Sequence, residues 1–393
     1  MGSIVGAMSH PPRFLIPALS ASNFLVGMGA FVIVGVIEPL GDDLGIDATA
    51  TGLLLTVYAL SYSVFSPLLV SLTGSIGRRR VMAAGLGLFA FAALLSALAP
   101  DFLTLQIARV FAAAGAGMFT PVAATVAAGL YPPENRAKVL AAVFFGLTLA
   151  QVIGVPAGSW LAYTFGWRWA FWSVVALALP CLYLVWTQVP AGLSFQPVSL
   201  TDLGTALSDG RMMLAVMFTG TFLGAIYVLY TFIAPLLSET MGYGRDGVAL
   251  VLVLFGCGAV MGNIAGGIMA DRVGWRATLT TLCLLQMAIM PLFSLLPMPD
   301  LALLILCLAW AASGWSFMAA QQLRLITLAG PRAAVILALN AAAIYVGAAV
   351  GSAIGAVVID LYGLSAIGLA AGLCSALALL HLILSAARTP ELA

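Results

Sequence analysis

Arg109 is the charged side chain whose position most needs a chemical explanation. It stands eight residues after Asp101, inside an apolar stretch long enough to cross a membrane. A charge in a membrane span costs about 2.5 kcal/mol or more, and it usually faces a cavity or a partner. Two interpretations fit the residue type. The guanidinium binds an anion or modulates a nearby proton site, or it is a structural post that donates hydrogen bonds to backbone carbonyls.

Glu38 and Asp360 are the carboxylates best placed to exchange a proton. Glu38 stands near the outer end of the first apolar stretch, directly before Pro39, and Asp360 stands at the outer end of the eleventh. A proton carrier must reach both sides of the membrane in turn. The alternative for Glu38 is a helix-end carboxylate in headgroup water. The candidate proton-coupling residues are therefore Glu38, Arg109 and Asp360.

The elements that carry these residues are predicted to be membrane-spanning helices. Of the 393 residues, 63% are hydrophobic and 7% are charged, whereas a soluble domain carries roughly 25% charged residues. Stretches of the ~20 apolar residues that cross a bilayer recur almost end to end. Lipid offers the backbone no hydrogen bonds, and the stretches do not alternate apolar with polar residues as barrel strands do, so helices are expected.

Twelve spans are expected, separated by short segments that hold glycine, proline and charged residues. Their predicted ranges are 14–38, 50–72, 80–98, 102–129, 138–162, 168–188, 211–236, 246–269, 277–296, 301–327, 335–359 and 363–386. The longest gap, 189–210, is polar, and a short surface helix is expected in it at 199–208. The predicted organisation is an N-terminal six-helix half at 1–188, a central cytoplasmic loop at 189–210 and a C-terminal six-helix half at 211–393.

The basic residues predict the orientation of these spans, because cytoplasmic loops are enriched in lysine and arginine. With the N-terminus in the cytoplasm, twelve of the 15 basic residues lie on or near the inner side: Arg13, Arg78, Arg79, Arg80, Arg136, Lys138, Arg211, Arg272, Arg276, Arg324, Arg332 and Arg388. Both termini are therefore expected to be cytoplasmic.

The two halves are related by an internal repeat with an offset of 197 residues. At this offset the glycines of the two halves coincide, as in the pairs 45 and 242, 77 and 274, 154 and 351, 158 and 355, and 166 and 363. The matching span positions make this common register significant in a chain of 41 glycines. Because each half has six spans, the halves share one orientation, which is typical of one large transporter fold.

These features resemble the major facilitator superfamily. The resemblance is carried by Gly74-Ser75-Ile76-Gly77-Arg78-Arg79-Arg80, Asp271-Arg272-Val273-Gly274-Trp275-Arg276, Arg109, Gly146, Gly154-Val155-Pro156-Ala157-Gly158, Gly166-Trp167-Arg168 and Ile233-Ala234-Pro235-Leu236-Leu237. The fifth-span motif is similar to that of exporters that exchange a substrate for protons. The last two segments resemble the drug, sugar and nucleoside efflux branch. The loop and fifth-span residues are expected to act in conformational change.

Two departures from the family pattern matter. The first-half loop usually carries an aspartate where Gly74 stands, and that aspartate helps to latch the halves. Asp271 occupies the equivalent position in the second half, so any latch of this kind is expected to be asymmetric. Many proton-coupled members also have a carboxylate deep in span one, where this chain offers Asn23 and no acid before Glu38.

The resemblance implies a substrate cavity lined by spans one, four, seven and ten, with additions from two and eleven. The helical period selects the face of each span that points inward. The candidate substrate-binding residues on these faces are Asn23, Tyr58, Tyr62, Arg109, Thr120, Tyr227, Tyr230, Thr231, Trp310, Ser313, Phe317, Asn340 and Tyr345. They predict an aromatic, weakly polar cavity with one fixed positive charge. The alternative for each aromatic residue is helix packing.

The expected function is export of a small amphiphilic or weakly anionic solute by alternating access, in exchange for protons. An uncoupled facilitator or importer is the alternative, and a membrane receptor or scaffold without transport is the alternative of another class. The expected location is a bacterial inner membrane, with lipids, protons and a small molecule as partners and a monomer as the unit.

Enzymatic functions find no support in the sequence. There is no phosphate-binding glycine-rich loop with lysine and serine or threonine, so direct use of ATP is not expected. The two histidines, His10 and His381, stand far from any nucleophile or metal-ligand set, and the five cysteines lie in apolar stretches. With a net charge of +1, no nucleic-acid partner is expected. No cofactor and no metal site are expected.

Overall fold

The protein is described by a computed structural model that covers residues 12–193, 200–329 and 333–387, and these residues contain helices and no strand. The first half contains α1 (Leu15–Leu44), α2 (Ala48–Leu72), α3 (Arg78–Ala97), α4 (Phe102–Leu130), α5 (Pro133–Leu149), the π-helical turn η1 (Ala150–Gly154), α6 (Val155–Phe165) and α7 (Arg168–Gln188). Short helix α8 (Leu200–Ser208) follows, which confirms the surface helix expected in the central loop.

The second half continues the all-helical pattern. It contains α9 (Gly210–Tyr230), α10 (Ile233–Met241), α11 (Arg245–Ile289), η2 (Met290–Leu295), α12 (Asp300–Trp315), α13 (Phe317–Ala329), α14 (Ala333–Tyr362), η4 (Leu364–Ala366) and α15 (Ile367–Ala387). Of the basic residues used to predict orientation, Arg332 and Arg388 lie outside the described residues, as do the side chains of Arg136 and Lys138.

The described residues form 11 helical segments that are long and apolar enough to cross a membrane. One of them, Arg245–Leu295, has 51 residues. At 1.5 Å per residue it would be about 75 Å long, more than twice the ~30 Å of a bilayer core. It turns at Gly274, whose φ of 76° and ψ of 166° are not helical. Counting a crossing on each side of Gly274 gives the twelve spans of the predicted fold.

The first span is longer than the sequence analysis predicted. Its helix does not end at Glu38 but continues through Pro39 to Leu44. A proline inside a helix leaves the carbonyl four residues earlier without its amide donor, and here that carbonyl belongs to Gly35. The Ser159 hydroxyl of α6 donates a 2.8 Å hydrogen bond to it. This bond from a neighbouring helix lets α1 pass the proline, so Glu38 lies inside the helix and not at its end.

A second proline is accommodated in the same way. Pro121 lies inside α4, and the carbonyl that it deprives of a donor is that of Gly117. The Ser66 hydroxyl of α2 donates to this carbonyl at 3.3 Å. Hydroxyls from adjacent helices thus satisfy backbone groups that lipid cannot satisfy.

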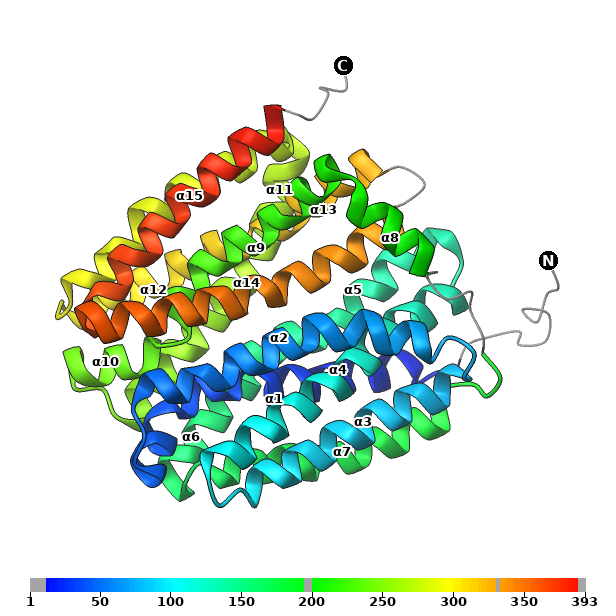
Figure 1. Ribbon diagram of the computed structural model, residues 1–393, viewed down its shortest axis with the longest axis horizontal. Helices are drawn as coiled ribbons and strands as arrows, with labels where there is room; N and C mark the ends of the chain where they lie inside the picture. Colours follow the sequence, from blue (N-terminus) through cyan, green and yellow to red (C-terminus); the bar gives the residue numbers. More distant parts are fainter. Residues whose placement is uncertain (1–11, 194–199, 330–332, 388–393) are drawn as a thin grey trace.

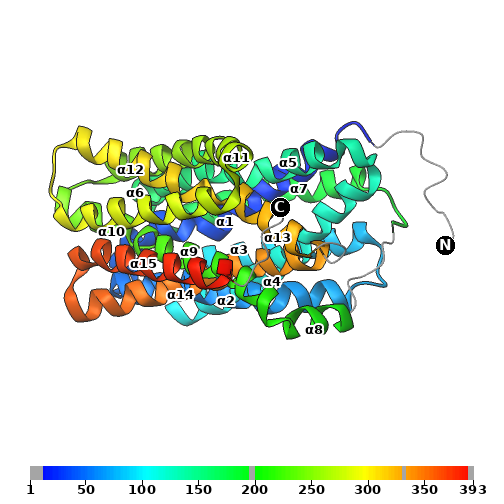
Figure 2. The ribbon, with the colours of Figure 1, turned by 90° about the horizontal axis from the view of Figure 1, so that it is seen from above.

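The helices run side by side in one bundle, with α2 and α14 adjacent along the boundary between the halves (Figure 1). Further contacts between the halves join α11 to α6, η1, α5 and α1, and α1 to α10. In both views α6 and α10 lie toward one end of the bundle and α8 toward the other (Figures 1 and 2). We call the first the distal end and the second the proximal end.

Burial separates the inner helices from the outer ones. The most apolar windows of Leu15–Leu44 and Gly210–Met241 are 83% and 78% buried, whereas those of α2 and α7 are 28% and 33% buried. Spans one and seven therefore form the centre of the bundle, and the outer helices expose leucine, isoleucine and valine side chains to the surroundings. Candidate residues on α1 and α9 therefore lie where side chains of both halves can contact them.

Candidate functional site

The carboxylate of Glu38 joins three helices at the distal end. Its Oε2 accepts a 2.5 Å hydrogen bond from the Tyr163 hydroxyl of α6, and its Oε1 accepts a 2.5 Å hydrogen bond from the Ser238 hydroxyl of α10. Tyr163 lies in the first half and Ser238 in the second. Glu38 is half-buried. It therefore links the halves and is not a helix-end carboxylate free in headgroup water.

Two further polar contacts cross between the halves at this end. Asp360 of α14 accepts a 3.0 Å hydrogen bond from the Thr49 hydroxyl of α2. Arg245, at the start of α11, donates to the Thr164 hydroxyl of α6 at 3.3 Å and lies 5.5 Å from the centre of the Trp160 ring. We name these contacts and the Glu38–Ser238 bond the distal latch. Both candidate proton carriers of the sequence analysis belong to it.

Arg109 is fully buried among the helices of the first half. Its Nη1 donates to the Gly29 carbonyl of α1 at 2.8 Å, and its Nη2 lies 3.4 Å from the Ser96 hydroxyl of α3. The guanidinium also lies 5.0 Å from the Phe171 ring centre and 5.9 Å from that of Tyr58. A hydrogen bond to a backbone carbonyl is the geometry of a structural post, the second of the two interpretations offered by the sequence.

Aromatic residues from both halves meet in the interior of the bundle. The rings of Tyr62 on α2 and Tyr345 on α14 stack with centroids 3.8 Å apart, and Tyr58 lies 6.2 Å from Tyr345. Tyr58 and Tyr62 are buried. The structure thus brings together three candidates that the sequence separates by nearly 300 residues.

A second aromatic group adjoins the centre from the other half. Tyr227 and Tyr230 of α9 lie 5.7 Å apart, and Tyr230 lies 6.3 Å from Trp310 of α12. Tyr227 also stacks at 6.2 Å on Phe31 of α1. We name Tyr58, Tyr62, Tyr345, Tyr227, Tyr230 and Trp310 together the central aromatic cluster.

Asn23 and Thr120 form a small polar pair beside this cluster. The Thr120 hydroxyl donates to Asn23 Oδ1 at 3.3 Å, and Asn23 Nδ2 donates to the Val143 carbonyl at 3.0 Å. The residue that follows Val143 by the repeat offset is Asn340, which accepts a 2.5 Å hydrogen bond from Thr219. Equivalent helices of the two halves, α1 with α5 and α9 with α14, thus each hold a polar bond near the same level.

The remaining candidates are occupied by local contacts. Thr231 donates to the Tyr227 carbonyl one turn earlier, at 2.8 Å. Ser313 accepts from Gln286 at 2.8 Å, and Phe317 stacks on Phe222 at 4.9 Å. None of these contacts joins the three side chains to a side chain of the central aromatic cluster, although Thr231 bonds to the backbone of Tyr227.

Sequence reasoning missed Tyr163 and Ser238. Ser159 and Tyr163 stand one turn apart on α6, just as the residues they contact, Gly35 and Glu38, stand nearly one turn apart on α1. Extending the helical period from Pro156 along span five would have placed Tyr163 on the face toward span one. Ser238 gave no such signal, because its contact depends on how the two halves meet.

The residues expected to act in conformational change lie at turns and close contacts. Gly77 precedes α3, and the Arg78 amide donates to the Leu193 carbonyl after α7 at 3.0 Å. Gly274 makes the turn within α11, while Asp271 and Arg272 are exposed and Arg276 donates to the Ala386 carbonyl of α15 at 3.3 Å.

The fifth-span motif contains the π-helical turn. Gly154 ends η1, and Pro156 follows at the start of α6. A side chain at Gly154 would contact Met28, and one at Gly158 would contact Val32, both on α1. Such single π-helical turns are frequent at functional sites. In the described part of the chain, no group of three or more histidine, cysteine or acidic residues is arranged to hold a metal ion.

The comparison with known families identifies the class of protein. The family described as Major Facilitator Superfamily matches residues 19–336. The chain belongs to this superfamily of transporters and is a multi-pass membrane protein. It is 30% identical to "Inner membrane transport protein YdhP" of Escherichia coli (strain K12), over 95% of this chain and 96% of that protein.

Two other relatives extend the comparison. "Uncharacterized MFS-type transporter YbcL" of Bacillus subtilis (strain 168) is 30% identical over 89% of this chain and 90% of that protein. "Chloramphenicol resistance protein" of Streptomyces lividans is 32% identical over 65% of this chain and 66% of that protein.

Solved structures support the fold. A bacterial homologue of the human lysosomal transporter Spinster, in an inward-facing and occupied conformation, superposes with a TM-score of 0.75 at 16% identity and covers 97% of this chain and 98% of that chain. The inward-facing and unoccupied form gives 0.73 at 17% identity and covers 95% and 96%.

Proposed function

We propose that this protein exports a small amphiphilic or weakly anionic solute by alternating access, in exchange for protons. The observation that carries the proposal is the central aromatic cluster, to which both halves contribute. The 3.8 Å stacking of Tyr62 on Tyr345 joins α2 to α14 across the boundary between the halves. A ligand bound here would contact both moving bodies, as alternating access requires.

The chemistry of the cluster suits a flat, partly apolar molecule. Aromatic rings offer large contact areas and stack on other rings. The Tyr58 hydroxyl and the Trp310 indole nitrogen are buried and have no hydrogen-bond partner among the described residues. These two donors suit acceptor groups on a substrate, because a buried donor is costly to leave unpaired. The candidate substrate-binding residues therefore remain those of the sequence analysis, with the cluster as their core.

The names of two relatives support this direction and location. One is called an inner membrane transport protein and another a chloramphenicol resistance protein. A transporter can confer resistance to a toxic compound by exporting it. We therefore infer a bacterial inner membrane as the location, an amphiphilic compound as the substrate class and a monomer as the working unit.

Glu38 is our principal candidate for the proton. As a carboxylate it accepts hydrogen bonds at both oxygens, from Tyr163 and from Ser238. A protonated carboxyl carries a donor on one oxygen and loses part of its acceptor capacity. Protonation would therefore weaken the distal latch and favour opening at that end. Asp360, which accepts from Thr49, is the second candidate.

Arg109 enters the proposal through α1. Its bond to the Gly29 carbonyl holds the helix that also carries Glu38. We propose that Arg109 fixes the position of α1 in the first half, so that movement at the distal latch is transmitted to the interior.

We further propose that residues 1–188 and 211–393 move as two bodies joined by 189–210. The proximal end, which holds Arg78, Arg79 and Arg80, would face the cytoplasm together with both termini. Contacts of the distal latch would then close the outer end, as in a state that opens inward.

A flux assay in proteoliposomes tests the proposal. Purified protein is reconstituted, loaded with a fluorescent amphiphilic compound and exposed to an imposed pH gradient. If a proton gradient directed opposite to the substrate flux accelerates that flux, the result supports proton exchange. Saturable flux that ignores the gradient would favour a facilitator or importer. A lack of saturable flux across a broad substrate set would favour a receptor or scaffold.

A further inference from the structure

His381 is the one histidine among the described residues, and both of its ring nitrogens contact α9. It is half-buried on α15, where its Nε2 lies 2.8 Å from the Leu214 carbonyl and its Nδ1 lies 3.0 Å from the Thr221 hydroxyl. The Thr221 hydroxyl lies in turn 3.0 Å from the Phe218 carbonyl. An ionisable side chain in a membrane span is costly and usually functional, so this arrangement calls for a chemical explanation.

The contacts of His381 suit both protonation states of the ring. The Leu214 carbonyl can only accept, so Nε2 must carry a hydrogen. In the neutral ring Nδ1 is then an acceptor, and the Thr221 hydroxyl donates to it. In the imidazolium Nδ1 also carries a hydrogen and donates to the Thr221 oxygen, which leaves the hydroxyl hydrogen for the Phe218 carbonyl. Each N–H of the charged ring therefore has an acceptor, and the proton changes the group to which Thr221 donates.

Arg324 of α13 is the charged side chain that faces this site. Its guanidinium lies 5.8 Å from the centre of the Phe218 ring, and the His381 ring packs edge-on against the same ring at 6.0 Å. Its Nη2 donates to the neutral Ser385 hydroxyl at 2.8 Å, whereas its Nε and Nη1 have no hydrogen-bond partner among the described residues. A protonated His381 would thus be a second positive charge beside Phe218.

The elements packed around α15 supply no acid at this level. Neither α9 nor α15 contains an acidic residue, and the acid of α14, Asp360, belongs to the distal latch. η2 and η4 have no ionisable residue. On the second part of α11, Arg276 donates to the Ala386 carbonyl at the end of α15 at 3.3 Å, and Arg211 lies at the exposed start of α9. Tyrosines and cysteines of these helices are uncharged where histidine titrates. A proton on His381 would therefore be held by the carbonyl and hydroxyl groups of α9.

The first half has no equivalent of this arrangement. At the repeat offset of 197, the positions of His381, Thr221 and Arg324 correspond to Leu184, Phe24 and Ala127.

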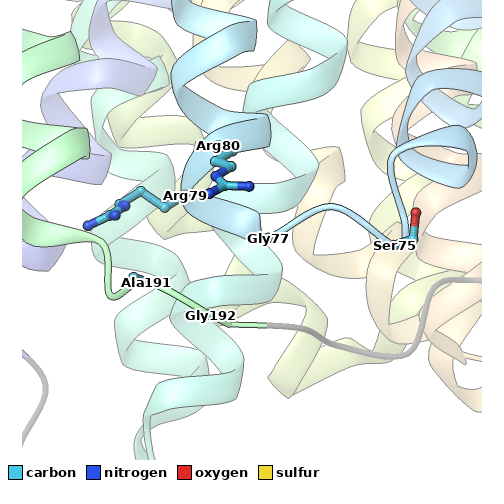
Figure 3. A pocket seen from close by; sticks show the side chains of 6 residues that line it. All are labelled: Ser75, Gly77, Arg79, Arg80, Ala191 and Gly192. Carbon is cyan, nitrogen blue, oxygen red and sulfur yellow. The ribbon is translucent and has the colours of Figure 1, made fainter.

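The arginines of the first half at the proximal end have a different setting. Figure 3 shows Arg79 and Arg80 on the first turn of α3, with the segment that carries Ala191 and Gly192 passing beneath them. Arginine keeps its charge throughout the physiological pH range, so these side chains cannot take up and release a proton. Among the described residues near this end, His381 has the side chain that can do so near neutral pH.

We propose that His381 is a proton-binding site of the second half, and that its proton acts on α9 through the Thr221 hydroxyl. Because α9 lies at the centre of the bundle and carries Tyr227 and Tyr230, a proton on the outer helix α15 would affect the span that reaches the central aromatic cluster. The site is separate from the distal latch. The proposal does not depend on the proposed function, since it holds whichever solute is moved and whether or not Glu38 carries a proton.

Nuclear magnetic resonance of the histidine rings tests the proposal. The full-length protein is purified with a histidine-free tag, labelled with ¹³C,¹⁵N-histidine and titrated in nanodiscs from about pH 5 to pH 8. The chain has two histidines, so the His10→Gln variant leaves His381 as the single source of signal. We expect a neutral ring with its hydrogen on Nε2 at high pH and an imidazolium at low pH. A ring that stays neutral across this range would overturn the proposal.

Thr221→Val tests the link to α9, because valine keeps the shape of threonine and lacks the hydroxyl. A hydrogen bond to the charged ring is stronger than one to the neutral ring, so the midpoint of the His381 titration should move to lower pH by about one pH unit, a ten-fold loss of proton affinity. Thr221→Ser restores the hydroxyl and should restore the midpoint, which separates the lost bond from misfolding.

Ser375→Ala is the matched control. Its hydroxyl also lies on α15 but contacts Met290 Sδ at 3.8 Å and not α9, so its loss should leave the midpoint of the His381 titration unchanged. Equal midpoints in the Thr221→Val and Ser375→Ala variants would show that Thr221 does not hold the protonated ring, and would overturn the proposed link to α9.

Discussion

Glu38 Oε1 accepts a 2.5 Å hydrogen bond from the hydroxyl of Ser238, which stands 200 residues away in the sequence. The bond is the most direct polar link that α1 makes with the second half. Because the carboxylate also accepts from Tyr163 in its own half, a single proton on Glu38 affects contacts on both sides of the boundary.

Replacing Glu38 with glutamine should uncouple flux from pH. Glutamine keeps the shape of the side chain but has no carboxylate that could take up a proton. In proteoliposomes, flux of the E38Q variant should continue and no longer respond to an imposed pH gradient. Asp360→Asn provides the comparison at the second carboxylate of the latch. If flux of the E38Q variant still responds to the pH gradient, the proton is carried by Asp360 or by the substrate and not by Glu38.

Replacing Ser238 with alanine should loosen the distal end. A hydrogen bond to a charged group contributes about 1.5–3 kcal/mol, so the closed state should lose about ten-fold or more of its population advantage. Spin labels on the exposed residues Asp42 and Glu239, in a cysteine-free background, should report longer distances.

Thr240→Val is the control for this variant. Thr240 lies on the same helix, and its hydroxyl bonds to the carbonyl of Leu236 within α10. Its distance distribution should match that of the unmodified protein. Equal distributions in the Ser238 and Thr240 variants would show that the Glu38–Ser238 bond does not hold the latch.

Replacing Arg109 with methionine should lower thermal stability. The guanidinium joins α4 to α1 and α3 through Gly29 and Ser96, and loss of its charge-assisted bonds should cost about 2 kcal/mol. Unfolding in detergent, followed by scanning fluorimetry, measures the change. Arg109→Lys keeps the charge but not the planar fork. Its thermal stability should lie between that of the unmodified protein and that of the methionine variant. If the methionine variant loses transport but keeps its thermal stability, Arg109 instead acts in substrate binding or proton coupling.

Replacing Gly256 with alanine should keep the halves from meeting as they do here. A methyl group at Gly256 on α11 would collide with the backbone of Gln151 and Val152 in η1, across the boundary. The protein should remain folded, because the collision lies between the halves, and transport should fall several-fold. Gly267→Ala, on the same helix with open space around it, should transport normally. Full transport by the Gly256 variant would mean that this contact is not part of the cycle.

The fold could be predicted from the sequence because lipid constrains a chain strongly. Apolar length identified the spans, and the repeat offset identified the halves. The end of α1 was missed, because whether a helix passes Pro39 depends on a hydroxyl, Ser159, supplied by another span. Sequence shows the proline and not the compensating donor.

The candidate site was predicted in part for a related reason. Helical period selects a face, and the tyrosines at positions 58, 62 and 345 were found because a large ring reaches across a helix boundary. Small hydroxyl residues are harder to assign from sequence. Thr231 bonds to its own helix, and Ser238 reaches Glu38, although both are short polar residues of the seventh span. The two hydroxyls have different partners because Ser238 lies where the two halves contact each other, and helical periodicity does not predict that contact.

The glycines at the repeat positions have a mechanical consequence. A side chain at Gly351 of α14 would collide with the backbone of Gly224 on α9, and one at Gly154 would press on Met28 of α1. In each half, therefore, the first span and the fifth are in near-backbone contact, with little room for side chains to absorb displacement. Such a pair behaves as a stiff lever. A tilt that separates the halves at the distal end must then bring them closer together at the proximal end, because the helices do not bend enough to absorb the movement.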